Sequence, residues 1–364
     1  AVARARGRDR LIHIAPGSLI GEIDSPATEI GGLRTLGGRL IVTAASPTEG
    51  PAVLALDSAT FAPAGVLRRS SAVAIDPAWI SVPEPITFPS TNGRMAHALF
   101  YPPVNPDVVG PEGELPPLVV YSHGGPTSNA LNSLNPDFQF LTSRGIAVVD
   151  VDYGGSTGYG REYRQALNGE WGVVDVDDCV AAARYLVDRG AVDGDRLAIE
   201  GGSAGGYTTL AALAFRDVFR AGISLFGVAD LEMLVHDTHK FEARYEERLI
   251  GPYPAMAERY RERSPVHFLD RISCPVLILQ GLEDRVVPPA QAEVMVAALA
   301  AQGIPHAYLA FEGEGHGFRG ELAQRRTLEA RLAFLGAVFG FTPADDLEPL
   351  DLPGLDAWRR RASA

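Results

Sequence analysis

The sequence predicts an α/β protein, with a mostly parallel sheet covered by helices on both faces and a β-rich segment before it. From about residue 86, buried-strand patterns alternate with helical patterns, which is typical of parallel sheets. Before Pro83-Glu-Pro85, short apolar stretches alternate with turn residues, as in antiparallel strands. We therefore expect a β-rich segment over residues 1–85, an α/β domain over 86–342 and a C-terminal tail over 343–364.

Composition excludes several classes of protein. Of the 364 residues, 46% are hydrophobic and 21% charged, as in ordinary globular proteins. The 32 basic and 45 acidic residues leave a net charge of −13, which argues against a nucleic acid or a membrane as partner. No apolar run reaches the ~18 residues of a membrane helix. With only Cys179 and Cys274, we expect buried, unpaired thiols and a cytoplasmic protein.

The β-rich segment is long enough for only a small number of strands. Its apolar stretches, at 11–14, 39–43 and 51–56, suffice for one or two propeller blades or a small sheet. Open strand edges bind other strands, so self-association into a homo-oligomer is one expectation. The chain begins without Met, which suggests a processed or truncated piece of a longer polypeptide.

The α/β domain is predicted from alternating elements. The expected strands cover 95–101, 118–121, 146–151, 196–200, 221–226, 276–280 and 306–311. The expected helices cover 175–189, 207–215, 290–302 and 322–339.

The segment Gly201-Gly-Ser203-Ala-Gly205 has the G-x-S-x-G pattern between a predicted strand and a predicted helix. In the α/β-hydrolase fold this pattern is a sharp turn that projects a nucleophilic Ser above the sheet. The glycines allow strand and helix to approach closely, and the helix N-terminus favours negative charge on the reacting oxygen. Ser203 is therefore the candidate nucleophile.

The two partners of the nucleophile should follow later strands, in the chain order Ser, Asp, His. Asp284 comes four residues after the strand at 276–280, and His316 lies in a Gly-rich loop after the strand at 306–311. Asp284 would orient the imidazole, which would act as the base. Glu283 is the competing carboxylate.

Acyl transfer also needs donors for the developing oxyanion. His123-Gly-Gly-Pro126 follows the strand at 118–121 and matches the turn that supplies one backbone N–H. We expect Gly125 to be this donor, with Gly124 as the alternative, and the N–H of Ala204 to be the second. Pro126 has no N–H to offer.

These motifs resemble the prolyl oligopeptidase family of serine peptidases, most of all its acylaminoacyl-peptidase-like branch. The resemblance covers about residues 86–342. It implies an α/β-hydrolase domain, an N-terminal β-propeller that limits access to short peptides, and peptide hydrolysis through an acyl-enzyme without metal or organic cofactor. Residues 1–85 would then be the end of the propeller, and its remainder would belong to another segment or chain.

The substrate is less well defined by sequence. Apolar residues such as Phe226 and Val228 could line a side-chain pocket, and a charged group could hold a substrate terminus. The candidates for the carboxylate end are Arg161, Arg164 and Arg319, and those for the amino end are Glu242, Glu246 and Glu247. Acylaminoacyl-peptidase, dipeptidyl-peptidase and carboxypeptidase action therefore all stay open.

Three other functions compete with an exopeptidase. A carboxylesterase or lipase would use the same triad. A non-catalytic binding protein on this scaffold would usually lack a triad member, and all three are present. A folded but inactive fragment of a peptidase is the third alternative, because most of a propeller is absent.

Overall fold

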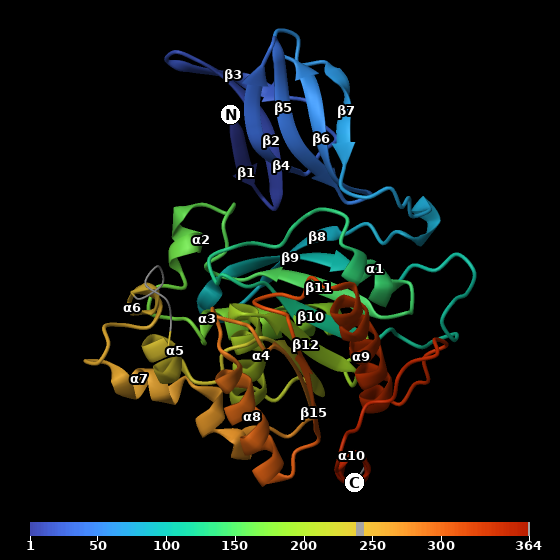
Figure 1. Ribbon diagram of the computed structural model, residues 1–364, viewed down its shortest axis with the longest axis vertical. Coiled ribbons are helices and arrows are strands. Elements are labelled where there is room, and N and C mark those ends of the chain that lie inside the picture. Colours follow the sequence, from blue (N-terminus) through green and yellow to red (C-terminus); the bar gives the residue numbers. More distant parts are fainter. Residues whose placement is uncertain (238–243, 363–364) are drawn as a thin grey trace.

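The computed structural model describes residues 1–237 and 244–362. Residues 2–69 form two antiparallel sheets that lie over the part of the α/β domain carrying β8 and β9 (Figure 1). The first sheet contains β1 (Val2–Ala5), β2 (Arg8–Ala15) and β3 (Ser18–Ile23). The second contains β4 (Glu29–Leu36), β5 (Arg39–Ser46), β6 (Glu49–Asp57) and β7 (Pro63–Arg69). The predicted β-rich segment is thus confirmed.

The α/β domain is built on an eight-stranded sheet with the order β15-β14-β13-β12-β10-β11-β9-β8. Strands β10 to β15 are parallel to one another, whereas β9 is antiparallel to both β11 and β8. The strands are β8 (Glu84–Pro89), β9 (Met95–Tyr101), β10 (Leu118–Ser122), β11 (Ala147–Asp152), β12 (Leu197–Gly202), β13 (Ala221–Leu225), β14 (Val276–Gly281) and β15 (His306–Phe311). The predicted fold class is confirmed.

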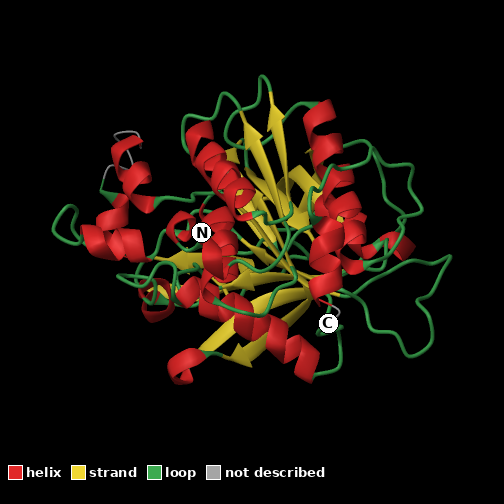
Figure 2. Ribbon diagram, turned by 90° about the horizontal axis from the view of Figure 1, so that it is seen from below, coloured by secondary structure: helices red, strands yellow, loops and turns green. Residues whose placement is uncertain are grey.

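Helices cover both faces of this sheet (Figure 2). Alternate strand residues point to opposite faces, so Val120 packs in one apolar core and Val119 in the other. The first face is covered by α3 (Val174–Asp188), α4 (Ala204–Phe215) and α8 (Pro289–Gln302). The second is covered by α1 (Pro136–Thr142) and α9 (Glu321–Phe339).

Shorter elements complete the domain. They are α2 (Arg161–Gln165), α5 (Leu231–Asp237), α6 (Tyr245–Leu249), α7 (Ala257–Glu262) and four 3₁₀ turns at Pro77–Trp79, Thr91–Gly93, Pro265–His267 and Leu269–Arg271. Across the described ranges, no helix is long and apolar enough to cross a lipid bilayer. Cys179 and Cys274 are buried and unpaired, as expected.

The sequence-based boundaries fall close to changes in the structure. Strand β8 begins at Glu84 and already belongs to the eight-stranded sheet, so this sheet starts slightly before residue 86. The expected tail contains α10 (Leu355–Ala362), and its Trp358 donates an indole N–H to Ser273 O at 2.6 Å. Described residues beyond 342, among them Leu347 and Trp358, therefore pack onto the α/β domain. The three-part division remains our proposal.

One ion pair is buried inside this domain. Arg331 of α9 is 2% exposed, and its guanidinium lies 2.8 Å from the carboxylate of Glu200, which is 1% exposed. A second carboxylate, Asp137 of α1, lies 3.2 Å away at the surface. Glu200 stands three residues before Ser203 on β12, so this pair fixes the strand that carries the candidate nucleophile.

We predict that Arg331→Met lowers the free energy of unfolding by about 4 kcal/mol, because the Glu200 carboxylate is left buried without its cation. Urea unfolding followed by tryptophan fluorescence measures this change. Arg325→Met is the control, because Arg325 lies on the same helix, is exposed and, among the described residues, forms its ion pair with Glu329 one turn away. Equal unfolding midpoints for the two variants would contradict the prediction.

Candidate active site

Ser203 lies in the sharp turn between β12 and α4. Its backbone has φ 58° and ψ −123°, a conformation that L-residues rarely adopt and that the surrounding structure must hold in place. Its N–H donates to Leu225 O at 3.0 Å, on the neighbouring strand β13. The turn therefore projects the Ser203 hydroxyl above the carboxyl edge of the sheet, as the G-x-S-x-G pattern predicts.

The glycines around Ser203 are required by close packing. A Cβ atom on Gly205 would lie 1.9 Å from Ser122 O, and one on Gly201 would lie 2.4 Å from the Gly205 carbonyl. Any side chain there would push α4 away from β10 and β12. The glycines thus let the helix start directly beneath the candidate nucleophile.

The structure brings the three predicted residues into one hydrogen-bonded chain. Ser203 Oγ lies 2.9 Å from His316 Nε2, and His316 Nδ1 lies 2.7 Å from Asp284 Oδ2. The Asp284 side chain is fully buried, and its other oxygen accepts N–H groups from Val286 and Val287. The competing carboxylate, Glu283, is exposed. This geometry makes His316 Nδ1 the donor to Asp284 and leaves Nε2 to accept the Ser203 proton.

A second buried carboxylate shapes the loop that carries His316. Glu314 is 9% exposed and accepts the backbone N–H groups of Arg319 and Gly320, each at 2.7 Å. These bonds close the loop around His316 just before α9 begins. Sequence reasoning overlooked Glu314, although its place two residues before His316 was a usable signal.

The candidate oxyanion donors lie beside the nucleophile turn. A Cβ on Gly124 would stand 3.5 Å from Ser203 Cβ, so the His123-Gly-Gly-Pro126 turn passes directly over it. Gly125 has φ +122°, and a Cβ there would lie 2.8 Å from Thr127 N, which excludes other residues. Within the described part of the chain, the amides of Gly125 and Ala204 have no hydrogen-bond acceptor. Both are therefore free to donate to a substrate oxygen.

His123 holds this turn rather than facing the substrate. It is 6% exposed, its Nδ1 donates to Gly124 O at 2.8 Å, and its Nε2 accepts from Ser156 Oγ at 2.7 Å. Its ring stacks on Tyr153, whose hydroxyl lies 3.0 Å from Pro126 O. Burial lowers the pKa of His123 to about 4, so the ring is neutral at neutral pH.

The candidate substrate residues occupy different environments. Phe226 has φ 39°, and its ring meets the His316 ring edge-to-face with centroids 4.8 Å apart. Val228 is 2% exposed and packs in the core, so it offers no surface to a substrate. Arg161 and Arg319 are exposed and make no ion pair with the described residues.

The remaining charged candidates also differ from one another. Arg164 and Glu247 are exposed, and Glu246 is 4% exposed, too buried to meet a substrate terminus freely. Glu242 lies outside the described residues. Over residues 1–237 and 244–362, no group of three or more His, Cys, Asp or Glu side chains is placed to hold a metal ion.

A sequence model described as the prolyl oligopeptidase family matches residues 132–342. The chain belongs to the prolyl oligopeptidase family. Membership in this family of serine-type peptidases agrees with the arrangement of Ser203, His316 and Asp284 above the sheet.

Curated relatives in the family are longer than this chain. Dipeptidyl aminopeptidase BIII of Pseudoxanthomonas mexicana is 38% identical over 208 residues, which are 56% of this chain and 30% of that protein. The acylamino-acid-releasing enzyme of Arabidopsis thaliana is 29% identical over 215 residues, which are 56% of this chain and 28% of that protein. The chain thus matches less than a third of the length of either relative.

Solved structures in the family match more of the chain. One described as puromycin hydrolase has a TM-score of 0.91 and 46% identity, and the match covers 95% of this chain and 53% of that one. A puromycin-hydrolyzing peptidase of Mycobacterium tuberculosis has a TM-score of 0.90 and 45% identity, covering 97% of this chain and 55% of that one. Both matches include the N-terminal sheets as well as the α/β domain.

We predict that His123 makes stability depend on pH between about 6.5 and 4. Unfolded His binds a proton near pH ~6.5 and the folded one only near 4, so its contribution is present above pH ~6.5 and lost as pH falls through 4. His123→Gln, which keeps a polar group for Ser156, should remove this contribution. The difference in unfolding free energy between the proteins should shrink by about 3 kcal/mol across the window. Urea titrations at a series of pH values measure it, and parallel curves would refute the assignment.

Proposed function

We propose that this chain is a serine exopeptidase that hydrolyses amide bonds of short substrates, with Ser203 as nucleophile, His316 as general base and Asp284 as its orienting carboxylate. One observation carries the proposal: hydrogen bonds run without a break from a serine at positive φ, through an imidazole, to a fully buried carboxylate. The family match supports the same chemistry.

The reaction would proceed in two halves. Ser203 Oγ attacks the substrate carbonyl while His316 Nε2 takes the hydroxyl proton, and the imidazolium pairs with Asp284. The oxyanion accepts N–H groups from Gly125 and Ala204. His316 then gives the proton to the leaving amine, which breaks the amide bond and leaves an acyl-enzyme. Water repeats the sequence in the second half, releasing the acid and restoring Ser203.

The substrate that we infer has a free amino group on its acyl side. The two structures whose descriptions name puromycin hydrolysis share 46% and 45% of residues over nearly the whole chain. Puromycin is an aminoacyl amide with a free amine. The relative named dipeptidyl aminopeptidase BIII is likewise, by its name, an enzyme that acts at an amino terminus. An acylaminoacyl peptidase would instead need a blocked amine, and the relative of that name is 29% identical.

We also propose that residues 1–85 are the end of a β-propeller whose remaining blades lie in another segment or chain. Their two antiparallel sheets of three and four strands support this view. The unpaired, buried cysteines favour a cytoplasmic place, because they require no oxidising compartment.

We predict that puromycin and a short peptide with a free amino terminus are hydrolysed, whereas the N-acetylated peptide is not. C-terminal amidation of the peptide should have no effect on its cleavage, because the proposed enzyme does not bind the C-terminal carboxylate of its substrate. Mass spectrometry of the products identifies the bond cleaved. Ser203→Ala should abolish turnover, and Asp284→Asn should lower kcat by about 10⁴-fold, because the imidazole loses its orienting partner.

Glu283→Gln is the matched control for Asp284, because it changes the adjacent, exposed carboxylate and should leave kcat unchanged. Cleavage of the acetylated peptide alone would replace our proposal with acylaminoacyl-peptidase action. Turnover of simple esters without amide cleavage would make the protein a carboxylesterase. Undiminished cleavage by Ser203→Ala would refute the mechanism.

A further inference from the structure

The loop between β10 and α1, residues 123–135, joins the active site to the N-terminal sheets. We call it the β10–α1 loop. Its first half carries Gly124 and Gly125 over the nucleophile. Its second half is bonded by residues of β1, of β5 and of the segment entering β4, more than eighty positions earlier in the chain.

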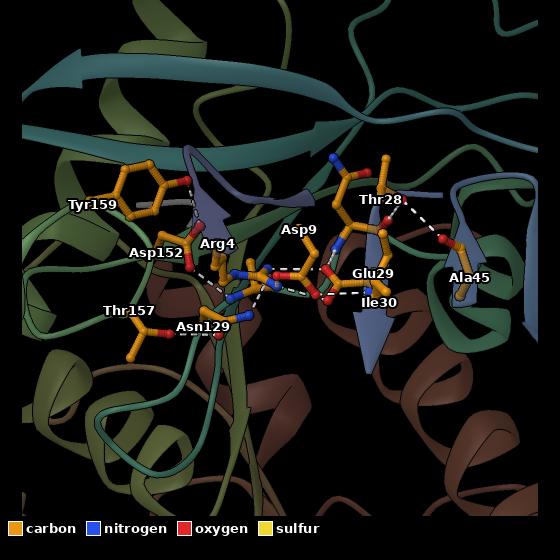
Figure 3. A network of polar contacts seen from close by, with 12 residues as sticks. Arg4, Asp9, Thr28, Glu29, Ile30, Ala45, Asn129, Asp152, Thr157 and Tyr159 are labelled. Carbon is orange, nitrogen blue, oxygen red and sulfur yellow. Dashed lines mark hydrogen bonds and ion pairs between the residues drawn. The ribbon is translucent and has the colours of Figure 1, made fainter. Parts of the chain in front are cut away.

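The bonds to the second half come from both backbone and side chains. Arg4 of β1 donates to Ala130 O at 2.8 Å, and the Glu29 carboxylate accepts Asn132 N–H at 2.8 Å. Figure 3 shows Arg4 and Glu29 close together in the network of polar contacts. The Thr28 hydroxyl donates to Asn132 O, and Leu134 N–H donates to Ser46 O at 2.7 Å. The N-terminal sheets therefore form hydrogen bonds with every second residue of this part of the loop, at positions 130, 132 and 134.

Arg4 is the charged centre of this contact. Its guanidinium makes two bonds to Glu29, at 2.7 and 3.0 Å, and one to Asp9 at 3.2 Å. Its side chain is only 15% exposed, so these bonds are shielded from water. The same guanidinium reaches Ala130 O, which makes it the bridge between the two N-terminal carboxylates and the β10–α1 loop.

Ala130 is held from the opposite side by a carboxylate of the sheet. Its N–H donates to Asp152 Oδ1 at 2.7 Å, and Tyr159 donates to the other Asp152 oxygen at 2.8 Å. Burial raises the pKa of Asp152 to about 6, and the positive charge of Arg4 opposes that rise. The Ala130 carbonyl also accepts from the side-chain amide of its neighbour Asn129 at 2.8 Å. Without Arg4, Asp152 would lose a nearby cation and Ala130 would lose its bond to the N-terminal sheets.

We propose that Arg4 is a positioning residue for the oxyanion hole: it holds Ala130 and thereby sets the place of the Gly124 and Gly125 amides above Ser203. This inference rests on the proposed function, since it concerns the stabilisation of the oxyanion. Through this one bond, the position of β1 on the α/β domain then influences the rate of the chemical step.

The test compares Arg4→Ala, Arg4→Lys and Glu29→Gln with the wild-type chain. Arg4→Ala should lower kcat by about 10- to 100-fold, because a displaced donor binds the transition state less well, and KM should change by less than about 3-fold. Arg4→Lys, which keeps the charge, should recover part of kcat. Glu29→Gln keeps an acceptor for Asn132 N–H but weakens the hold on Arg4, and should lower kcat less than Arg4→Ala.

Arg10→Ala is the matched control. Arg10 lies on β2 in the same sheet and pairs with Glu22 at 2.6 Å, but the two side chains are 42% and 47% exposed and neither bonds to a described residue of the α/β domain. Its kcat should equal that of the wild type. If Arg4→Ala has the same kcat as Arg10→Ala, or if only its KM rises, the proposal is overturned. Should Arg4→Ala fail to fold, Glu29→Gln decides by the same criteria.

Labelling by a fluorophosphonate separates this inference from the proposed function, because it needs Ser203 and the oxyanion hole but no peptide. A positioning role lowers the labelling rate of Arg4→Ala while the final extent stays at one label per chain. A merely structural role lowers the extent instead, and would overturn the inference. If wild type is labelled but cleaves no amide, only the proposed function fails. If wild type is not labelled, both fail.

Discussion

The rest of the site depends on how closely the start of α4 approaches the ends of β10 and β12. No side chain fits between them, because a Cβ on Gly205 would lie 1.9 Å from Ser122 O. The same constraint recurs where the loop that carries His316 crosses β14, since a Cβ on Gly281 would lie 2.4 Å from Gly315 O. Main chain therefore packs on main chain at both crossings. This contact brings Ser203 and His316 to hydrogen-bonding distance at the carboxyl edge of the sheet.

Buried carboxylates fix the loops that rise from that edge. Asp284 and Glu314 each accept backbone N–H groups of their own loop and so fix its shape, whereas Asp152 of β11 accepts a backbone N–H from the β10–α1 loop and holds that loop to the sheet. Such a carboxylate is costly to bury unless its hydrogen bonds or a cation compensate. Asp284 and Glu314 receive two backbone bonds each, whereas Asp152 relies on one backbone bond, Tyr159 and the charge of Arg4. Among these three carboxylates, the one whose charge depends on a residue of the N-terminal sheets is therefore Asp152.

Local patterns were sufficient to predict the main elements, because a buried strand and a glycine-rich turn are each recognisable within a few residues. All seven strands expected over 95–311 are present, and the motif residues converge at the sheet edge. Contacts between distant residues carry no such pattern: Arg4 and Ala130 are 126 positions apart. Hydrophobicity alone also does not distinguish a residue that lines a substrate pocket from one in the core. For this reason Val228 was a candidate for the pocket, although the structure buries it. The helix α10 was expected only as a tail, because its packing depends on Trp358 meeting Ser273 far away.

The buried pair of Arg331 and Glu200 has a consequence for the order in which the chain can fold. The two residues are 131 positions apart, and the acidic partner is synthesised first. At about 5–20 residues per second, a ribosome needs roughly ten seconds to reach the arginine. During that interval, packing β12 into the sheet would bury the charged Glu200 carboxylate without its cation, which is costly. The pair therefore favours a folding order in which the sheet and the Ser203 turn close after the last long helix, α9, has emerged from the ribosome.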